Sequence, residues 1–293
     1  MLSGAVAYHD LAQNHPKVVE QVVALMSRHP QASQFEAEIT GLDSDAEAEV
    51  LFVYMTRWAD DIRGQSAYDH PKWHYVNIPY VPAEAGDQSN GAPQDADNIV
   101  STLAANAGII RDSGSSDAQK AIALCWLFHQ VGDLHQPLHV VTMITPELPA
   151  GDKGGNLIFV RRGPESSVER LHAVWDNAAV NLDKPASITR LARRLTRVPS
   201  AQRSAFQELT DRPYADASSF ERWAREESYL LAVRVAYQGG TLAASYSEER
   251  AVVLSAAYMD WAKDLSLRRV ILSGYRLADV LTALFPPGPQ AAR

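Results

Sequence analysis

Cysteine is almost absent from this sequence of 293 residues, which contains only Cys125. A single thiol excludes a disulfide within the chain, and it also excludes a metal site built from several cysteines. Any metal site would therefore need nitrogen and oxygen ligands. Because Cys125 lies in the apolar run 121–128, we interpret it as a small core residue.

The chain also lacks an excess of positive charge. It has 27 basic and 35 acidic residues, a formal net charge of -8, and no basic stripe. The composition therefore argues against tight binding of long duplex nucleic acid through many phosphate contacts. A short single strand held at a cationic metal site stays compatible with this composition, because a bound cation inverts the local field.

Long apolar runs are missing as well. No run approaches the roughly 18–20 residues that a membrane helix requires. Met1 is followed by the mixed segment 2–13, which has no signal-peptide pattern. The sequence thus predicts either a cytoplasmic protein or a chain given without its original front end.

Helical periodicity of apolar residues dominates what is present. Apolar faces, caps and prolines predict helices over 17–29, 44–63, 94–111, 116–135, 173–182, 187–196, 218–238 and 246–280. Ser44 with Glu47, and Ser116, are the expected caps of two of them. One small β-hairpin is predicted from 156–162 through a turn to 168–175, and 79–93 is predicted to be a loop. We expect a mainly α fold, with one domain over 1–285 and a disordered tail over 286–293.

The segment 129-HQVGDLHQPLH-139 carries the strongest chemical signal, with four potential metal ligands in eleven residues. His129 and Asp133 are four residues apart, so they share one face of a helix. Pro137 ends or bends that helix and brings His139 in from a new direction. Imidazole and carboxylate groups that converge from two backbone segments suit a zinc ion.

Further ligands repeat this pattern elsewhere in the chain. His172 and Asp176 again lie four residues apart, and Asp60 and His74 stand upstream. The residues divide into a set suited to one zinc (Asp60, His74, His129 and Asp133) and a three-ligand set that leaves an open position (His139, His172 and Asp176). Asp133 is the best candidate for a bridging ligand. His135 is expected to orient a carboxylate or a backbone carbonyl behind the ligands. Closely spaced zinc ions assist phosphoester cleavage by activating water and stabilising charged oxygens.

These motifs resemble the zinc-dependent single-strand-specific nucleases of plants, fungi and bacteria, the S-one/P-one or mung-bean type, which share a superfamily with zinc phospholipase C. The matching segments are 58-WAD-60, 73-WHYVN-77, 129-HQVGDLHQPLH-139, 154-GGN-156 and 172-HAVWD-176. Order and spacing agree from about residue 5 to 180. The resemblance implies the multi-helix phospholipase C/P-one nuclease fold and a trinuclear zinc site, with Asp133 as the bridge to the third ion.

The resemblance also implies roles in substrate binding. It places Arg63 on the scissile phosphate, a task that suits a guanidinium. Tyr75 matches a position where an aromatic ring stacks on a base. Asn77 stands where family members often have Asp, so its base preference stays open. Gly155 and Asn156 are expected to line the substrate pocket.

One feature departs from the family pattern. The third zinc of the family is held by a mature N-terminal Trp and a nearby His, and here no Trp precedes Trp58. We expect two complete zinc sites in this chain and a third only where that Trp and His are present. Either the start is assigned too late, with a signal peptide and this motif upstream, or the chain is a divergent member with two zinc ions. The chain as given would then be a weak nuclease, and the family resemblance implies a secreted or periplasmic protein.

The sequence thus predicts a zinc-dependent phosphodiesterase: an endonuclease that hydrolyses single-stranded DNA or RNA by metal-activated water, with 3′-nucleotidase activity also compatible. A phospholipase C-like lipid phosphodiesterase and a catalytically weakened zinc-binding protein are the alternatives. Single-stranded nucleic acid or a nucleotide is the expected partner, and no protein partner can be inferred.

Overall fold

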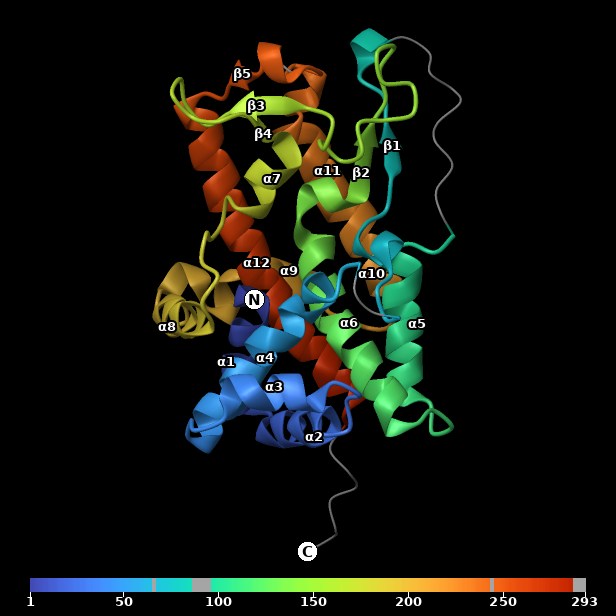
Figure 1. Ribbon diagram of the computed structural model, residues 1–293, viewed down its shortest axis with the longest axis vertical. Helices are drawn as coiled ribbons and strands as arrows, with labels where there is room; N and C mark the ends of the chain where they lie inside the picture. The colour runs from blue at the N-terminus through green and yellow to red at the C-terminus, as the bar shows by residue number, and fades with distance from the viewer. Residues whose placement is uncertain (65–66, 86–95, 243–244, 287–293) are drawn as a thin grey trace, which may run out of the picture.

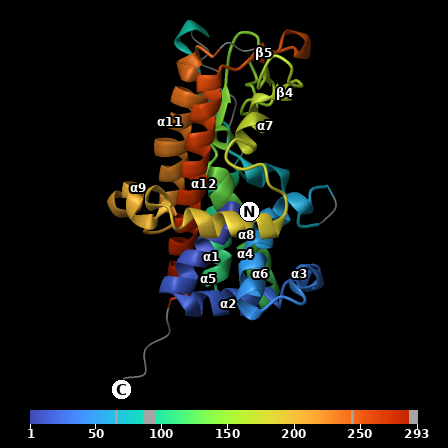
Figure 2. The ribbon, with the colours of Figure 1, turned by 90° about the vertical axis from the view of Figure 1, so that its left-hand side faces the viewer.

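The computed structural model describes the chain except residues 65–66, 86–95, 243–244 and 287–293. The architecture is mainly α-helical, as the sequence predicts (Figure 1). Its longest element is α12 (Ala256–Leu284), which runs along most of the molecule beside the 218–238 segment (Figures 1 and 2). The hydroxyl of Ser255 caps α12 by accepting a hydrogen bond from the Tyr258 amide.

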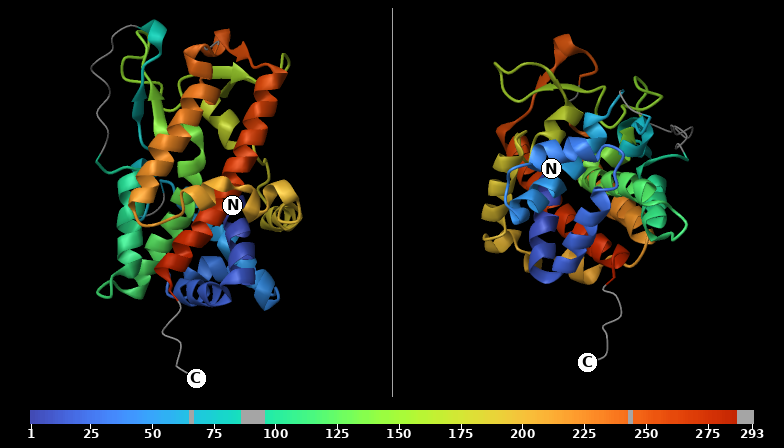
Figure 3. Two further views of the ribbon diagram at one scale, coloured as in Figure 1. Left: turned by 180° about the vertical axis from the view of Figure 1, so that it is seen from behind. Right: turned by 60° about the horizontal axis from the view of Figure 1, so that its bottom comes forward.

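Helices from the first half of the chain gather around the lower part of α12 (Figure 3). They are α1 (Leu2–Asn14), α2 (Pro16–Met26), α3 (Ala32–Ile39), α4 (Ser44–Asp61), α5 (Ile99–Arg111) and α6 (Asp117–His135). Helix α1 is packed between α4 and α12. Two glycines permit this approach: a Cβ on Gly4 would lie 2.3 Å from the Phe52 carbonyl oxygen, and one on Gly274 would lie 2.6 Å from the Val6 Cβ.

Helix α6 is the buried centre of this bundle. Ser116 and Gln119 form the capping box at its start, and Pro137 follows its end. Apolar residues surround its middle part, 121–128, including the fully buried Trp126 and Phe128. A helix with an apolar surface all round is stable only inside the core, so α6 holds the residues at its C-terminal end in fixed positions.

Short strands form two small sheets above the bundle. Strands β1 (Ile78–Tyr80) and β2 (Val141–Met143) pair in parallel, and β3 pairs antiparallel with β4 and parallel with β5. The strands of the second sheet are β3 (Phe159–Arg161), β4 (Glu169–Arg170) and β5 (Val252–Val253). The predicted hairpin is confirmed in the β3–β4 pair. However, its second strand ends at Arg170, and the next residues form a helix.

The remaining helices follow this hairpin in the chain and precede α12. They are α7 (Leu171–Asp176), α8 (Pro185–Leu195), α9 (Gln207–Asp211), α10 (Ser218–Arg222) and α11 (Tyr229–Leu231). Two π-helical stretches (Trp223–Ser228 and Ala232–Ala236) interrupt the helix predicted over 218–238. Short 3₁₀ turns occupy Pro71–His74, Ala83–Ala85, Pro137–Val140, Pro199–Ala201, Arg203–Ala205, Gln238–Gly240 and Glu248–Arg250.

Several predicted boundaries need correction. Helix α12 begins ten residues later than the predicted 246, because Glu248–Arg250 forms a 3₁₀ turn and β5 intervenes. The N-cap of α4 is Asp43, which accepts a hydrogen bond from the Ala46 amide, and not Ser44. The predicted loop 79–93 begins inside β1, and most of its remainder lies outside the described residues, as does the predicted tail beyond Pro286. Among the described helices, none combines the length and the apolar character that a membrane span requires.

Candidate metal centre

A cavity of about 1620 Å³ opens where the C-terminal ends of α4 and α6 meet α7. All seven predicted metal ligands line it: Asp60, His74, His129, Asp133, His139, His172 and Asp176. They come from five elements that span more than a hundred residues of sequence. The packing of α6 in the core explains why these distant segments meet at one place.

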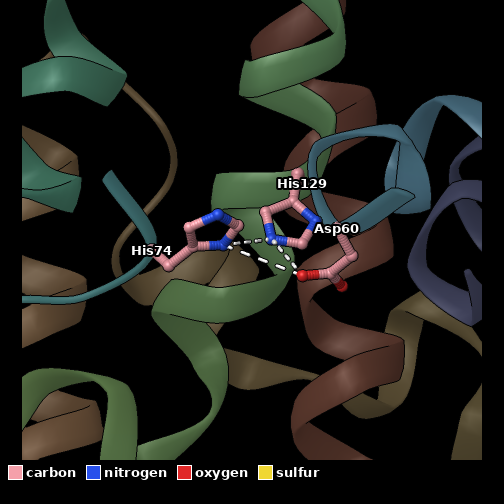
Figure 4. A group of neighbouring side chains, drawn as sticks. All are labelled: Asp60, His74 and His129. Carbon is pink, nitrogen blue, oxygen red and sulfur yellow. Dashed lines mark hydrogen bonds and ion pairs between the residues drawn. The ribbon is translucent and has the colours of Figure 1, made fainter. Parts of the chain in front are cut away.

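The first group consists of Asp60, His74 and His129, whose ligand atoms lie within 4.8 Å of one another (Figure 4). Asp60 lies at the end of α4, His74 ends the 3₁₀ turn Pro71–His74, and His129 is in α6. The His74 Nδ1 is 2.8 Å from the His129 Nε2, and both nitrogens face the Asp60 carboxylate at 4.0 and 3.8 Å. Two imidazole nitrogens aimed at each other and at a carboxylate form a donor set that zinc accepts.

Asp133 stands between this group and the second one. Its Oδ2 is 2.8 Å from the His129 Nε2 one helical turn earlier, 3.2 Å from the His74 Nδ1 and 3.5 Å from the His139 Nδ1. A single carboxylate oxygen thus reaches histidines of both groups. The contact with His139 is at Nδ1, the nitrogen that faces the His74 carbonyl, whereas the Nε2 of His139 faces Asp176. Asp133 therefore belongs with the first group and lies next to the second.

The second group consists of His139, His172 and Asp176, again within 4.8 Å of one another. His139 comes from the 3₁₀ turn Pro137–Val140, and the other two lie one turn apart in α7. The Asp176 carboxylate is 3.3 Å from the His139 Nε2 and 3.6 Å from the His172 Nε2. The side-chain amide of Gln136 donates to Asp176 at 2.8 Å and fixes its rotamer.

Backbone carbonyls orient three of the four histidines. The Nδ1 atoms of His129, His139 and His172 lie 2.7–2.8 Å from the carbonyl oxygens of Thr56, His74 and Gly154. A carbonyl accepts only, so in each neutral ring Nδ1 carries the proton and the Nε2 lone pair is free for a ligand bond. The His74 ring has the opposite orientation, because its Nδ1 faces the other ligands of the first group. Its buried Nε2 has no hydrogen-bond partner among the described residues.

The electrostatic field of the cavity favours cations. Although burial opposes it, the imidazoles of His129 and His139 hold the pKa of Asp133 well below its usual range. Burial also acts against a charged His139, but the carboxylates of Asp133 and Asp176 raise its pKa to about 10. Burial lowers the pKa of His74 and of His172. Although burial opposes it, the carboxylate of Asp133 also raises the pKa of His129. Imidazoles whose pKa is raised by ionised carboxylates mark a place that attracts positive charge, and a zinc ion can take the place of the ring proton. The residues present therefore fit a bound zinc ion.

The buried carboxylate of Asp152 positions the second group indirectly, through the backbone turn at Gly154 and Gly155. Asp152 accepts hydrogen bonds from the amides of Met143, Gly154 and Gly155 and from the Tyr237 hydroxyl, at 2.7–3.1 Å. These bonds hold a left-handed turn in which Gly154 has a φ of 62°. The turn places the Gly154 carbonyl on the His172 imidazole.

The residues predicted to bind substrate are found around the same cavity, with one exception. Arg63 donates to Asp60 at 2.8 Å and lies 3.0 Å from the His74 Nδ1, with half of its side chain exposed. Tyr75, Asn77 and Asn156 also line the cavity. Gly155 does not line it; it packs against Leu138 and Leu171, and its carbonyl accepts from the His172 amide.

His135 lines the cavity but belongs to neither ligand group. Its Nδ1 donates to the Val131 carbonyl at 2.7 Å, so its Nε2 accepts from Arg276 at 2.9 Å. Arg276 and Arg269 both pair with Glu227. His135 therefore connects the end of α6 to this buried ion pair and to α12.

The sequence reasoning missed three residues that shape the site: Thr56, Gln136 and Asp152. Thr56 acts through its backbone carbonyl, which leaves no trace in the side-chain pattern. Gln136 stands inside the motif 129–139, next to the helix-ending Pro137, and Asp152 comes shortly before the paired glycines 154–155. A polar residue beside such a turn is the signal by which these two could have been found.

Comparison with known proteins agrees with this geometry. The profile of the family described as S1/P1 Nuclease matches residues 1–286. Endonuclease 5 of Arabidopsis thaliana is 28% identical over 258 residues, which cover 80% of this chain and 78% of that protein. Endonuclease 4 of the same plant is 31% identical over 188 residues, 58% of this chain and 52% of that protein. The match thus spans about half the length of endonuclease 4. Because the family profile covers nearly the whole sequence, this chain belongs to the S1/P1 nuclease family.

Proposed function

We propose that this protein is a zinc-dependent phosphodiesterase that cleaves single-stranded DNA and RNA. The observation that carries the proposal is the convergence of two His and Asp groups in one cavity, with Asp133 between them and 2.8 Å from the His129 Nε2. Membership of the S1/P1 nuclease family supports it. Family membership is also the basis for proposing a secreted or periplasmic site of action.

Two zinc sites are part of this proposal. Asp60, His74, His129 and Asp133 would hold one ion, and His139, His172 and Asp176 would hold the other. Zinc, when bound, supplies the Lewis acidity that activates water and neutralises charge on a phosphoryl group. The second set has three protein ligands, the number found in zinc sites that keep one position open for chemistry.

The chain's own residues would bind and orient the substrate. Arg63 is half-exposed beside Asp60, so its guanidinium can turn toward a phosphate and form two parallel hydrogen bonds with it. We propose that Tyr75 stacks on a base and that Asn77 and Asn156 contact base edges. All three line the same cavity as the ligand groups.

The cavity suits a nucleotide better than a lipid. Charged side chains on its wall include Arg57, Arg63, Lys153 and Arg170, and Leu182 is its exposed large apolar residue. A lipid phosphodiesterase needs an apolar mouth for acyl chains. Neither this alternative nor a silent zinc-binding protein has a specific observation in its favour.

The test is to load the protein with zinc, measure its zinc content, and assay cleavage of single-stranded and duplex DNA. We expect cleavage of the single strand and a loss of several powers of ten in Asp133→Ala, where each factor of ten is about 1.4 kcal/mol of transition-state stabilisation. Asp260→Ala is the matched control, because Asp260 is exposed on α12 and does not line the cavity. Full activity in Asp133→Ala, or no cleavage by the zinc-loaded protein, would overturn the proposal.

A further inference from the structure

Two cations on the cavity wall have no part in the ligand groups. Lys153 and Arg170 are exposed and line the cavity, and within the described chain neither has an ion pair. The carboxylate next to Arg170, that of Glu169, is already held by Arg162 through two hydrogen bonds of 2.8 and 3.1 Å. Both cations are therefore available to an anion that enters the cavity.

The backbone brings these two residues to the same side of the second ligand group. Lys153 immediately precedes Gly154, whose carbonyl holds the His172 imidazole, and Arg170 is two residues before His172. The turn that contains Lys153 and Gly154 contacts the segment that follows the β3–β4 hairpin, since a Cβ on Gly155 would lie 3.3 Å from the Leu171 Cβ. Arg63, in contrast, stands beside the first group. The cavity thus has cationic side chains on both sides of the ligand groups.

The local backbone does not favour either residue. Lys153 has a φ of 57°, a left-handed conformation that costs a non-glycine residue roughly 1–2 kcal/mol. Arg170 occupies the N-cap of α7 and makes no capping hydrogen bond, although Ser, Thr, Asp and Asn are the residues that stabilise this position. Two unpaired cations in positions that suit other residues point to a role in binding.

We propose that Lys153 and Arg170 form a second phosphate site, which binds the phosphate next to the scissile one in a single-stranded substrate. This inference rests on the proposed function, since it takes the ligand groups as the place of the scissile phosphate. An extended strand presents a phosphate at every nucleotide, so a strand lying across the cavity brings an adjacent phosphate to these cations. The site selects substrates with more than one phosphate.

The test compares the dinucleotide TpT with its terminally phosphorylated forms pTpT and TpTp. For the zinc-loaded protein we expect kcat/KM to be roughly tenfold higher for at least one phosphorylated form, equivalent to about 1.4 kcal/mol. This preference should weaken as salt is added. In Lys153→Gly with Arg170→Ser it should fall to about one, while kcat/KM for TpT stays unchanged.

These substitutions also separate binding from folding. Lys153→Gly relieves the left-handed strain and Arg170→Ser supplies a cap, so the double variant should melt at the same temperature as the wild type or higher. Gln238→Gly is the matched control: Gln238 also has a positive φ, of 50°, and does not line the cavity. That variant should keep the preference for the phosphorylated form.

A binding measurement keeps this inference distinct from the proposed function. Calorimetry with phosphorothioate-linked analogues of the same dinucleotides, which resist hydrolysis, should show the same affinity ratio in the wild type and its loss in the double variant. Absence of TpT cleavage would contradict only the proposed function. The ratio of affinities for the phosphorylated and unphosphorylated analogues would still test whether Lys153 and Arg170 bind a phosphate. Equal affinity for all forms in the wild type, or a preference that survives in the double variant, would overturn the inference.

Discussion

Asp152 shows how one buried side chain can set the geometry of a ligand it does not touch. Its carboxylate accepts from three backbone amides and the Tyr237 hydroxyl, and the turn it holds positions the carbonyl that orients His172. An amide at this position would direct an NH₂ group at those donors. A buried donor left without a partner costs about 1–3 kcal/mol.

We therefore predict that Asp152→Asn lowers the free energy of unfolding by about 1–3 kcal/mol and reduces zinc bound at the second group. Denaturant unfolding and measured zinc content check the two effects. Tyr237→Phe removes one of the donors and should cost about 1 kcal/mol with less effect on zinc. Normal zinc content in Asp152→Asn would contradict the positioning role.

His29 gives a prediction for pH. It is 3% exposed, packs edge-on against Phe35 and Trp58, and accepts a hydrogen bond from the Gln31 amide. Burial lowers its pKa to about 4. The unfolded chain, with a His pKa of about 6.5, binds the proton first as pH falls, so stability is lost between about 6.5 and 4.

The loss attributable to His29 should reach about 3 kcal/mol near the lower end of this window. His29→Asn keeps an acceptor for the Gln31 amide but does not titrate, so its unfolding free energy should fall less with acid. Parallel unfolding curves at several pH values, with the metal ligands common to both proteins, isolate this difference. Identical pH profiles would show that His29 does not titrate as a buried group.

At the scale of elements, the contact of α1 with α12 depends on the missing side chain of Gly274. A Cβ there would lie 2.6 Å from the Val6 Cβ and 2.8 Å from the Ser3 carbonyl oxygen, so the helices would have to separate. We predict that Gly274→Ala destabilises the protein by about 1–3 kcal/mol through overpacking. The measurement is a thermal or urea unfolding curve.

Gly108→Ala in α5 is the matched control with the opposite sign. Gly108 is exposed, and a Cβ added to it meets no atom within 4 Å. Alanine in an exposed helix interior should stabilise the protein by about 0.5–1 kcal/mol. A stabilising Gly274→Ala would mean that α1 and α12 can move apart without loss of packing.

The elements differ in how well the sequence predicts them. The ends of α6 follow from a capping box and a proline, which act locally, so its predicted range agrees with the structure within about a residue. Strands β1 and β2 have three residues each, too few to show a two-residue period, and they pair across more than sixty residues of sequence. The π-helical turns at Trp223–Ser228 and Ala232–Ala236 depend on packing, which no local pattern records.

The candidate site was predictable to a similar extent. Helix geometry alone places His129 beside Asp133 and His172 beside Asp176. Six of the seven predicted ligands form the two groups that the fold brings together, and Asp133 lies between them. Carbonyls that orient the rings, such as that of Thr56, become visible only when α4 and α6 are packed against each other.

At the scale of the whole molecule, the ligand groups join segments from residue 60 to residue 176. The Asp133 and Asp176 carboxylates of this cavity raise the pKa of His139 to about 10, so the site attracts positive charge. A bound ion therefore stabilises the folded chain by RT ln(1 + [L]/Kd), about 2.7 kcal/mol when zinc exceeds Kd a hundredfold.

We predict that removing zinc with a chelator lowers the melting temperature and that added zinc restores it. Scanning calorimetry before and after chelation measures this shift, and Asp260→Ala, an exposed position away from the cavity, should shift as the wild type does. Asp133→Ala should respond less to zinc. A melting temperature that does not change with chelator would show that the groups hold no ion in the folded protein.

The hydrogen bond from the His139 Nδ1 to the His74 carbonyl, 2.7 Å long, has a consequence for the order in which the groups fill. The Val76 amide returns a second bond to the His139 carbonyl at 2.8 Å. A ligand histidine of one group is thereby fastened to the backbone of a ligand in the other, and Asp133 contacts both. An ion entering either group fixes part of the other before that one is occupied, so the two sites should load cooperatively, with few half-filled molecules at any point in a titration.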